Sequence, residues 1–303
     1  MKKFLGIDCQ EVGFGDLGLL IAEPIGPRIL SLSYQNSGNI FAELPDTALA
    51  HPTMGEYKFY GGHRLWVAPE EPAITYEPDN RAVEFEWAGN GVNVIGEIEP
   101  GSGLRKSIRI QTTNYLNVIQ VDHLVRNEGS SSRKIAPWAI TQLKLGGTAV
   151  LPLQAADIQN PLLPNRSLVL WPYTDLSESR LKIGREFVFI RTLPKNDAAL
   201  KVGASNLQQW IAYFIGKYLF VKYSRKDAAD CALDLGAEAQ SYCNGQFLEL
   251  ETLGSYRELR PGETIEHREI WRMEKGSFAS MDEEALGDFL KNDEMAAICR
   301  EML

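Results

Sequence analysis

The stretch AVEFEWAGNGVNVIGEIE, residues 82–99, alternates apolar and polar side chains on both sides of a glycine-rich turn at residues 89–91. In AVEFEWA, Val83, Phe85 and Trp87 fall on one face and the two glutamates on the other. Successive side chains of a strand point to opposite faces, so this period of two is typical of a half-buried strand. Two such runs around a Gly-Asn-Gly turn predict a β-hairpin.

The same alternation continues along most of the chain. LRKSIRIQTT (104–113) and NVIQVDHLVRN (117–127) repeat it. Seven further strands are predicted at TAVLPL (148–153), SLVLWPY (167–173), EFVFIR (186–191), WIAYFIG (210–216), YLFVKYS (218–224), FLELETL (247–253) and EHREIWRM (266–273). Turn residues separate the runs, which indicates an all-β protein with many antiparallel strands. Arg260-Pro261-Gly262-Glu263 predicts a hairpin-like reversal between the last two.

Two segments depart from this pattern. KNDAALKVG (195–203) is too polar for a buried strand. From residue 277 the composition predicts a helix, with Ser280 as its cap and Glu283 three residues later in a capping-box spacing. Because no linker or repeat interrupts the strands, we expect one sandwich domain over residues 1–276 and a helical extension over 277–303 that packs on it.

Composition excludes several classes of function. The 303 residues carry a net charge of -9, whereas nucleic acids and anionic membranes attract basic surfaces. No apolar run is long enough for a membrane span or a signal peptide. The four cysteines have no CxxC spacing, so we expect reduced thiols, no metal site and a cytoplasmic protein.

Four separated blocks share a resemblance. They are GGHRLWVAPE (61–70), IAPWAITQLKLGGTAVLPL (135–153), LWPYTDLSESR (170–180) and FLELETLGSYRELRPGETIEHREIWRM (247–273). Together they resemble the galactose mutarotase-like superfamily, in particular its aldose-epimerase-like branch. The resemblance implies a β-supersandwich of two twisted antiparallel sheets with a sugar-sized cleft. It also implies an enzyme that interconverts sugar anomers with a base and an acid, without metal or cofactor.

In this superfamily the base is a glutamate late in the chain that precedes a threonine-like residue. Glu251, followed by Thr252, matches this pattern, and Glu249 is the second candidate. The two glutamates are two positions apart on one strand and so share a face. The alternative is that both lie on a solvated face of the sheet.

The histidines that act as the acid in this superfamily are missing from their expected positions in this sequence. Trp138 stands where a histidine is expected, and Tyr60, instead of a second histidine, precedes the glycine pair. His63 follows that pair and is our candidate acid. His123 lies within an apolar strand, which favours a packed position.

The matching blocks also supply candidate substrate-binding residues. Trp66 offers a flat apolar surface to a sugar ring, and Arg64 and Gln142 offer hydrogen bonds to hydroxyl groups. The full set is Arg64, Trp66, Trp138, Gln142, Lys144, Tyr173 and Lys222. Its basic members favour a sugar or an anionic sugar derivative. Lys222, a charge within an apolar strand, faces either the surface or a polar cleft.

Two functions follow from this set of residues. One is an aldose-epimerase-like isomerase that uses Glu251 or Glu249 with His63. The other is a sugar-binding protein that keeps the cleft but has lost the acid. In both cases we expect a small-molecule carbohydrate as ligand and a monomer or homodimer.

Overall fold

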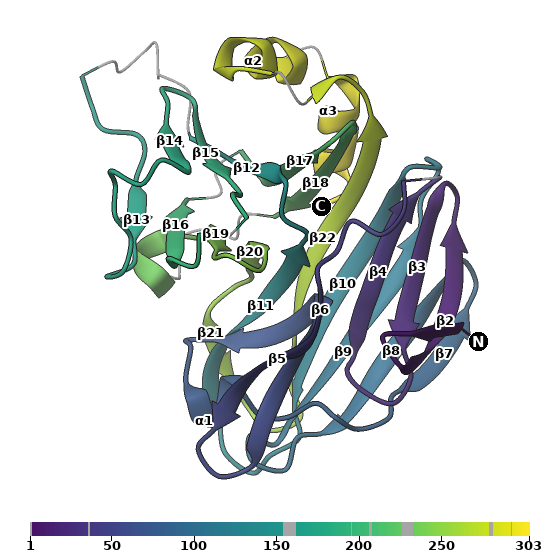
Figure 1. Cartoon of the computed structure of the whole chain (residues 1–303). Helices are drawn as coiled ribbons and strands as arrows, with labels where there is room; N and C mark the ends of the chain where they lie inside the picture. Colours follow the sequence, from purple (N-terminus) through teal and green to yellow (C-terminus); the bar gives the residue numbers. More distant parts are fainter. Residues whose placement is uncertain are drawn as a thin grey trace.

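The structure of the chain, a computed structural model, describes residues 2–35, 37–153, 162–194, 196–205, 208–225, 233–278, 281–291 and 293–303. Within these ranges most regular structure is β-strand, arranged in two large antiparallel sheets (Figure 1). The predicted all-β sandwich with a short C-terminal helical segment is therefore confirmed. The hairpin expected at residues 82–99 is also present, since β7 and β8 pair from Ala88 and Gly91 outward.

The first sheet contains the N-terminal strands. Its order in space is β1 (Lys2–Phe4), β2 (Ile7–Phe14), β3 (Leu17–Ala22), β4 (Arg28–Tyr34), β6 (Gly55–Ala68), β11 (Arg133–Leu143), β20 (Leu248–Leu253), β19 (Ala239–Cys243), β16 (Leu200–Ala204) and β13 (Leu168–Leu170). In addition, β5 (Glu43–His51) pairs with β6, and β21 (Arg257–Leu259) pairs with β11.

The second sheet packs against the first. Its order is β14 (Leu181–Ile183), β15 (Phe187–Arg191), β12 (Gly147–Pro152), β17 (Trp210–Ile215), β18 (Tyr218–Ser224), β22 (Thr264–Lys275), β10 (Val118–Asn127), β9 (Leu104–Thr112), β8 (Gly91–Ile98) and β7 (Glu84–Ala88). The short helical elements are α1 (Pro72–Thr75), the 3₁₀ turn at Leu233–Gly236, α2 (Glu283–Lys291) and α3 (Glu294–Glu301).

The main core lies between the two sheets. Inward side chains of the first sheet, such as Leu65 and Leu250, belong to the same buried cluster as Val121 and Trp271 of the second. The outer face of the first sheet has its own aromatic cluster, which includes Trp66 and Trp138. The sheet therefore has two buried faces, and the residue alternation decides which of them each side chain joins.

The glycine pair in GGHRLW lies close to the backbone of neighbouring segments. Gly61 and Gly62 both have positive φ, at 88° and 76°. A Cβ at Gly61 would lie 1.9 Å from the carbonyl oxygen of Ala42, and one at Gly62 would lie 2.2 Å from that of Ile29. The glycines therefore allow close approach of neighbouring backbone.

Two local expectations from the sequence are wrong. Residues 200–203 of the segment judged too polar for a buried strand belong to β16, which is buried along its whole length. The turn at residues 260–263 does not join β20 to β22 as a hairpin, because those strands lie in different sheets. The turn follows β21, which pairs with β11, so the chain crosses here between the two sheets.

The C-terminal helices cover the outer face of the second sheet (Figure 1). Phe278, Leu286 and Cys299 pack with Tyr223 and Ile270 in one buried cluster. The expected Ser280 cap lies outside the described residues, and α2 begins at Glu283. Among the described residues, no helix is both long and apolar enough to cross a membrane.

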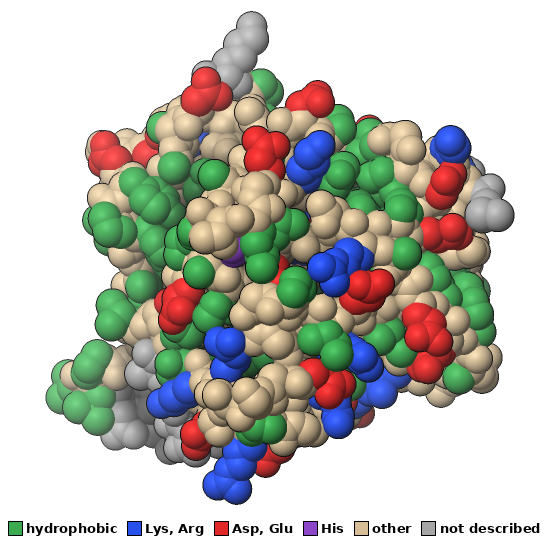
Figure 2. Space-filling view, turned by 90° about the horizontal axis from the view of Figure 1, so that it is seen from below, with side chains coloured by type: hydrophobic (Ala, Val, Ile, Leu, Met, Phe, Trp, Pro, Cys, Tyr) green, Lys and Arg blue, Asp and Glu red, His purple; other side chains and the backbone are tan. Residues whose placement is uncertain are grey.

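The surface carries charges of both signs. Figure 2 shows acidic and basic side chains interleaved over the face seen from below, without a broad region of one sign. Cys9, Cys243 and Cys299 are free and buried, and Cys231 lies outside the described residues.

Candidate functional site

Strand register brings five polar side chains together on the outer face of the first sheet. Arg64 of β6 lies opposite Ile140 of β11, and Ile140 lies opposite Glu251 of β20. By the same register Gln142 lies opposite Glu249. Lys201 of β16 lies opposite Tyr242 of β19, which in turn lies opposite Glu249. We call Arg64, Gln142, Lys201, Glu249 and Glu251 the outer-face cluster.

The members of the outer-face cluster are bonded in two groups. Glu249 Oε1 accepts hydrogen bonds from Arg64 Nη2 at 3.0 Å and Gln142 Nε2 at 2.9 Å. Glu251 Oε2 accepts from Lys201 Nζ at 2.8 Å and Trp138 Nε1 at 2.8 Å. Each carboxylate is thus tied to one cation and one neutral donor.

Glu251 is the most perturbed acid of the cluster. Its side chain is fully buried, and burial raises its pKa to about 7. The negative charge of Glu249 adds to the rise, while Lys201 and the Trp138 indole act against it. A carboxyl group with this pKa exchanges a proton readily near neutral pH, which is the property of a general acid or base.

Several buried polar atoms of this face have no hydrogen-bond partner among the described residues. They are Arg64 Nε and Nη1, Trp66 Nε1, Gln142 Oε1, Gln240 Oε1 and Glu251 Oε1. Each such atom costs about 1–3 kcal/mol of stability. Gln240 lies opposite Glu251 in the β19–β20 register, so donors and acceptors gather around the same acid.

Aromatic rings border the outer-face cluster. The Arg64 guanidinium lies over the rings of Phe59 and Trp66, at 4.7 and 4.3 Å from their centroids. The Lys201 ammonium lies 4.8 Å from the ring of Trp138 and 4.6 Å from that of Trp171. These cation–π contacts hold both cations in fixed positions.

A second polar group, the inter-sheet cluster, lies on the other side of the first sheet. His63, Thr141 and Thr252 point inward from it and meet His123, Lys222, His267 and Glu269 of the second sheet. Glu269 Oε1 pairs with Lys222 Nζ at 2.7 Å, and Glu269 Oε2 accepts from Trp271 Nε1 at 2.7 Å. Lys222 also donates to the carbonyl oxygens of Ala139 and Leu250 beneath the outer-face cluster.

Two of the three histidines of the inter-sheet cluster, His63 and His123, are neutral at pH 7. Their Nε2 atoms are 2.7 Å apart, His63 Nδ1 meets the Thr141 hydroxyl at 2.8 Å, and His123 Nδ1 donates to a backbone carbonyl at 3.0 Å. Burial lowers the pKa of both, and for His63 the nearby His123 and Lys222 lower it further. A single chain of hydrogen bonds, with one proton between the rings, satisfies this geometry.

His63, His123 and Glu269 form the one group in the described ranges with metal-ligand atoms this close together, all within 4.8 Å of one another. Their lone pairs are already engaged in the hydrogen bonds above. A cation there would also lie beside the Lys222 ammonium, which is buried and paired with Glu269. The arrangement therefore fits a hydrogen-bonded support better than a metal centre.

The structure brings some of the predicted site residues together and separates others. Arg64, Trp66, Trp138, Gln142, Glu249 and Glu251 share the outer face. Tyr173 is half exposed near them, with its ring 6.4 Å from that of Tyr242. Lys144 lies beyond the end of β11, where it pairs with Glu43 at 2.6 Å.

His63 and Lys222 do not join the outer-face cluster, because both point into the space between the sheets. His63 follows Gly62 and precedes Arg64, so alternation sends it to the opposite face from Arg64. Lys222, whose direction the sequence left open, is fully buried and faces neither the surface nor the outer-face cluster.

Lys201 is the site residue that the sequence reasoning missed. It lies in the segment judged too polar for a strand. The spacing Leu200-Lys201-Val202 is itself an alternation, and it was the signal that could have placed this lysine on a sheet face.

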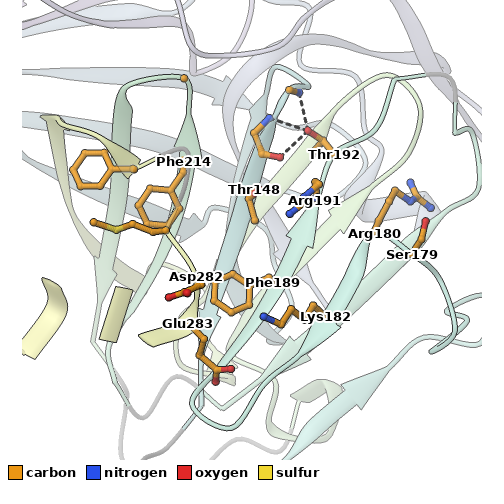
Figure 3. Close-up of a pocket in the computed structure, with 15 residues that line it drawn as sticks. Thr148, Ser179, Arg180, Lys182, Phe189, Arg191, Thr192, Phe214, Asp282 and Glu283 are labelled. Carbon is orange, nitrogen blue, oxygen red and sulfur yellow. Dashed lines mark hydrogen bonds between the residues drawn. The ribbon is translucent and has the colours of Figure 1, made fainter. Parts of the chain in front are cut away.

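A separate cavity of about 670 Å³ lies at the far end of the second sheet, beside the start of α2 (Figure 3). Phe189 and Phe214 line it, together with Lys182, Arg191 and Asp282. Those three charged side chains are exposed and therefore hydrated. None of the catalytic or substrate-binding candidates named in the sequence analysis lines this cavity, and we place the candidate site at the outer-face cluster.

Known structures share this architecture. A galactose mutarotase-like protein from Lactobacillus casei is similar with a TM-score of 0.56 at 9% identity, over 88% of this chain and 100% of its own. A galactose mutarotase related enzyme from Lactobacillus acidophilus has a TM-score of 0.54 at 9% identity, over 91% and 100%. An aldose epimerase homologue from C. elegans has a TM-score of 0.51 at 9% identity, over 89% and 100%.

These likenesses establish the fold. The chain has the galactose mutarotase-like sandwich, as the four blocks of sequence predicted. No protein-family model and no curated protein matches it.

Proposed function

We propose that the chain binds a small carbohydrate at the outer-face cluster and acts as an aldose-epimerase-like isomerase in which Glu251 moves the proton. The observation that carries this proposal is Glu251 itself. It is buried, burial raises its pKa to about 7, and its Oε1 has no partner among the described residues. The similar folds of proteins named as mutarotases and aldose epimerases support the choice of a sugar.

The cluster supplies what a sugar needs for recognition. Hydroxyl groups both donate and accept hydrogen bonds, and the unpartnered atoms of Arg64, Gln142 and Gln240 offer both kinds of partner. The rings of Trp66 and Trp138 border the cluster, and the half-exposed ring of Tyr173 near them is the aromatic surface that a sugar can reach. The two cations of the cluster are already paired with Glu249 and Glu251, which favours a sugar that presents hydroxyl groups over one that presents a phosphate.

The reaction requires few parts. Ionised Glu251 takes the proton of the anomeric hydroxyl, the bond between C1 and the ring oxygen breaks, and the ring oxygen takes a proton. Rotation about the C1–C2 bond and reclosure then give the other anomer. General acid–base catalysis of this kind contributes about 10²–10⁴-fold to a rate.

A second candidate function is sugar binding without catalysis. One observation favours it: His63, the acid expected from the sequence, lies on the opposite face of the first sheet from Glu251. A protein that had kept the binding surface but lost its acid would have this arrangement.

Ligand-observed NMR on a panel of aldoses, sugar phosphates and uronic acids tests both functions in the same samples. Saturation transfer reports binding, and exchange between the α and β anomeric signals reports catalysis. We expect exchange that Glu251→Gln abolishes while binding remains, and Glu284→Gln, an exposed glutamate, serves as the matched control. Binding without exchange would select the second function, and neither signal across the panel would contradict both.

The remaining expectations from the sequence, a cytoplasmic location and a monomer or homodimer, stay proposals. Fractionation of cells and light scattering of the purified protein test them.

A further inference from the structure

We propose that Lys201 is the proton donor of the site and takes the role that the sequence assigned to His63. This inference rests on the proposed isomerase function. In it, Lys201 protonates the ring oxygen of the sugar while Glu251 removes the proton of the anomeric hydroxyl.

The position of Lys201 fits an acid that works with Glu251. Its Nζ lies 2.8 Å from Glu251 Oε2, and Glu251 Oε1 is the oxygen without a partner among the described residues. The carboxylate can therefore use Oε1 on the substrate while Oε2 stays in contact with the lysine. Lys201 is only 5% exposed, so water does not compete freely for its proton.

The indole rings of Trp138 and Trp171 hold the ammonium group. Their centroids lie 4.8 and 4.6 Å from Nζ, and the faces of aromatic rings attract a cation. Trp138 also donates to the same oxygen of Glu251 as Lys201 does. One side chain thus orients both the acid and the base, as a preorganised pair requires.

The other side chains near Glu251 fit the task of proton donor less well. The guanidinium of Arg64 does not release a proton near neutral pH. Burial raises the pKa of the phenols of Tyr173 and Tyr242 above the ordinary value, and nearby carboxylates add to the rise. His63 is separated from Glu251 by the sheet itself. Of the described groups in contact with Glu251, the lysine ammonium is the one that fits the task.

The proton balance closes within the pair. On ring opening the O1 proton passes to Glu251 Oε1, the C1–O5 bond breaks as the C1=O1 double bond forms, and a Lys201 proton passes to O5. The products are an open-chain aldehyde, a neutral Glu251 and a neutral Lys201 amine. Reclosure on either face of the carbonyl reverses these transfers, so Glu251 and Lys201 return to their starting protonation states. No oxidant, reductant or cofactor enters the balance.

Two variants of Lys201 separate proton donation from charge. Lys201→Arg keeps a cation beside Glu251, but that cation does not release a proton. We expect it to bind the sugar within a few-fold of the unaltered protein and to lose anomer exchange by at least about 100-fold, the lower range for general acid catalysis. In Lys201→Ala we expect added ethylammonium to restore part of the exchange, a rescue that a purely structural lysine would not show.

The outcomes distinguish this inference from the function on which it rests. Exchange retained in Lys201→Arg but lost in Glu251→Gln would overturn the role of Lys201 and leave the isomerase in place. No exchange in the unaltered protein would overturn both. Circular dichroism of each variant checks that the sandwich is intact, and Lys182→Arg, an exposed lysine in the second sheet, is the matched control.

Discussion

At the scale of single residues, Glu251 shows how neighbours set the chemistry of one carboxyl group. Burial raises its pKa, Glu249 raises it further, and Lys201 and Trp138 oppose the rise. Together these effects leave the pKa of Glu251 close to neutral pH, so that both protonation states are populated there. A single hydrogen bond therefore shifts the pH at which Glu251 changes its protonation state.

Trp138→Phe tests this dependence. Phenylalanine keeps a ring under Lys201 but removes the N–H that donates to Glu251 Oε2, a bond that favours the ionised form. We expect the carboxyl signal of Glu251 in ¹³C NMR, assigned with Glu251→Gln, to titrate near pH 7 in the unaltered protein and at higher pH in Trp138→Phe. Trp87→Phe, at an exposed tryptophan of β7, is the control and leaves the midpoint unchanged. A lower midpoint in Trp138→Phe would contradict the assigned role of the indole.

At the scale of elements, the single strand β20 contributes side chains to both the outer-face cluster and the inter-sheet cluster. In β20, Glu249 and Glu251 face outward while Leu250 and Thr252 face inward, and every residue of the strand is buried. The inward face rests on Lys222, whose ammonium bonds to Glu269 and to carbonyl oxygens of β11 and β20. The ion pair between the sheets thus holds the strands that carry the site.

Lys222→Met is expected to destabilise the protein by about 3–5 kcal/mol, because Glu269 is then a buried carboxylate without its cation. Urea denaturation measures the loss. In the double variant Lys222→Met/Glu269→Gln, which removes both charges, we expect a substantial part of that stability to return. A double variant as unstable as the sum of its two single variants would show that the pair does not act as a unit.

One side chain at the start of the last helix makes two contacts in addition to the apolar packing of that helix. Asp293 Oδ1 accepts from the backbone N–H of Ala296 at the start of α3, and Oδ2 pairs with buried Arg272 of β22 at 2.6 Å. Asp293→Ala removes both contacts, and we expect a loss of more than the ~1 kcal/mol of a helix cap. Asp293→Asn keeps the cap and serves as the matched variant, so its loss measured in urea is smaller. Equal losses in the two variants would mean that the cap contributes nothing.

At the scale of the whole molecule, the neutral histidines between the sheets make the fold sensitive to acid. Burial holds the pKa of His63 and of His123 below the ordinary value of 6.5, so the unfolded chain binds protons that the folded chain does not. Stability from these groups is present above pH 6.5 and is lost as the pH falls below it, by up to about 1.4 kcal/mol per pH unit for each histidine.

His63→Gln isolates this effect from the other titrating groups. We expect its free energy of unfolding, measured in urea from pH 8 to pH 5.5, to fall less steeply than that of the unaltered protein. At pH 8 we expect the His63→Gln variant to be less stable than the unaltered protein, because glutamine does not reproduce the hydrogen bonds to Thr141 and His123. Parallel pH profiles would show that His63 titrates alike in the folded and unfolded states.

Local patterns predicted a large part of this architecture. Alternation in AVEFEWA and in YLFVKYS marked the strands β7 and β18, because a side chain's face in a strand depends only on its position in the run. The same rule placed Glu249 and Glu251 on one face. It failed for β16, a strand of five residues whose lysine is buried through contacts with Glu251 and two tryptophans far away in the sequence.

The sequence by itself therefore determined the all-β class and the C-terminal helices, since these depend on the period and composition of short segments. Only the tertiary structure decided which residues meet. It set His63 between the sheets, beside His123, and Lys201 on the outer face, against Glu251. The reason is that strand order and the backbone approach at Gly61 and Gly62 arise from long-range pairing, which no local pattern contains.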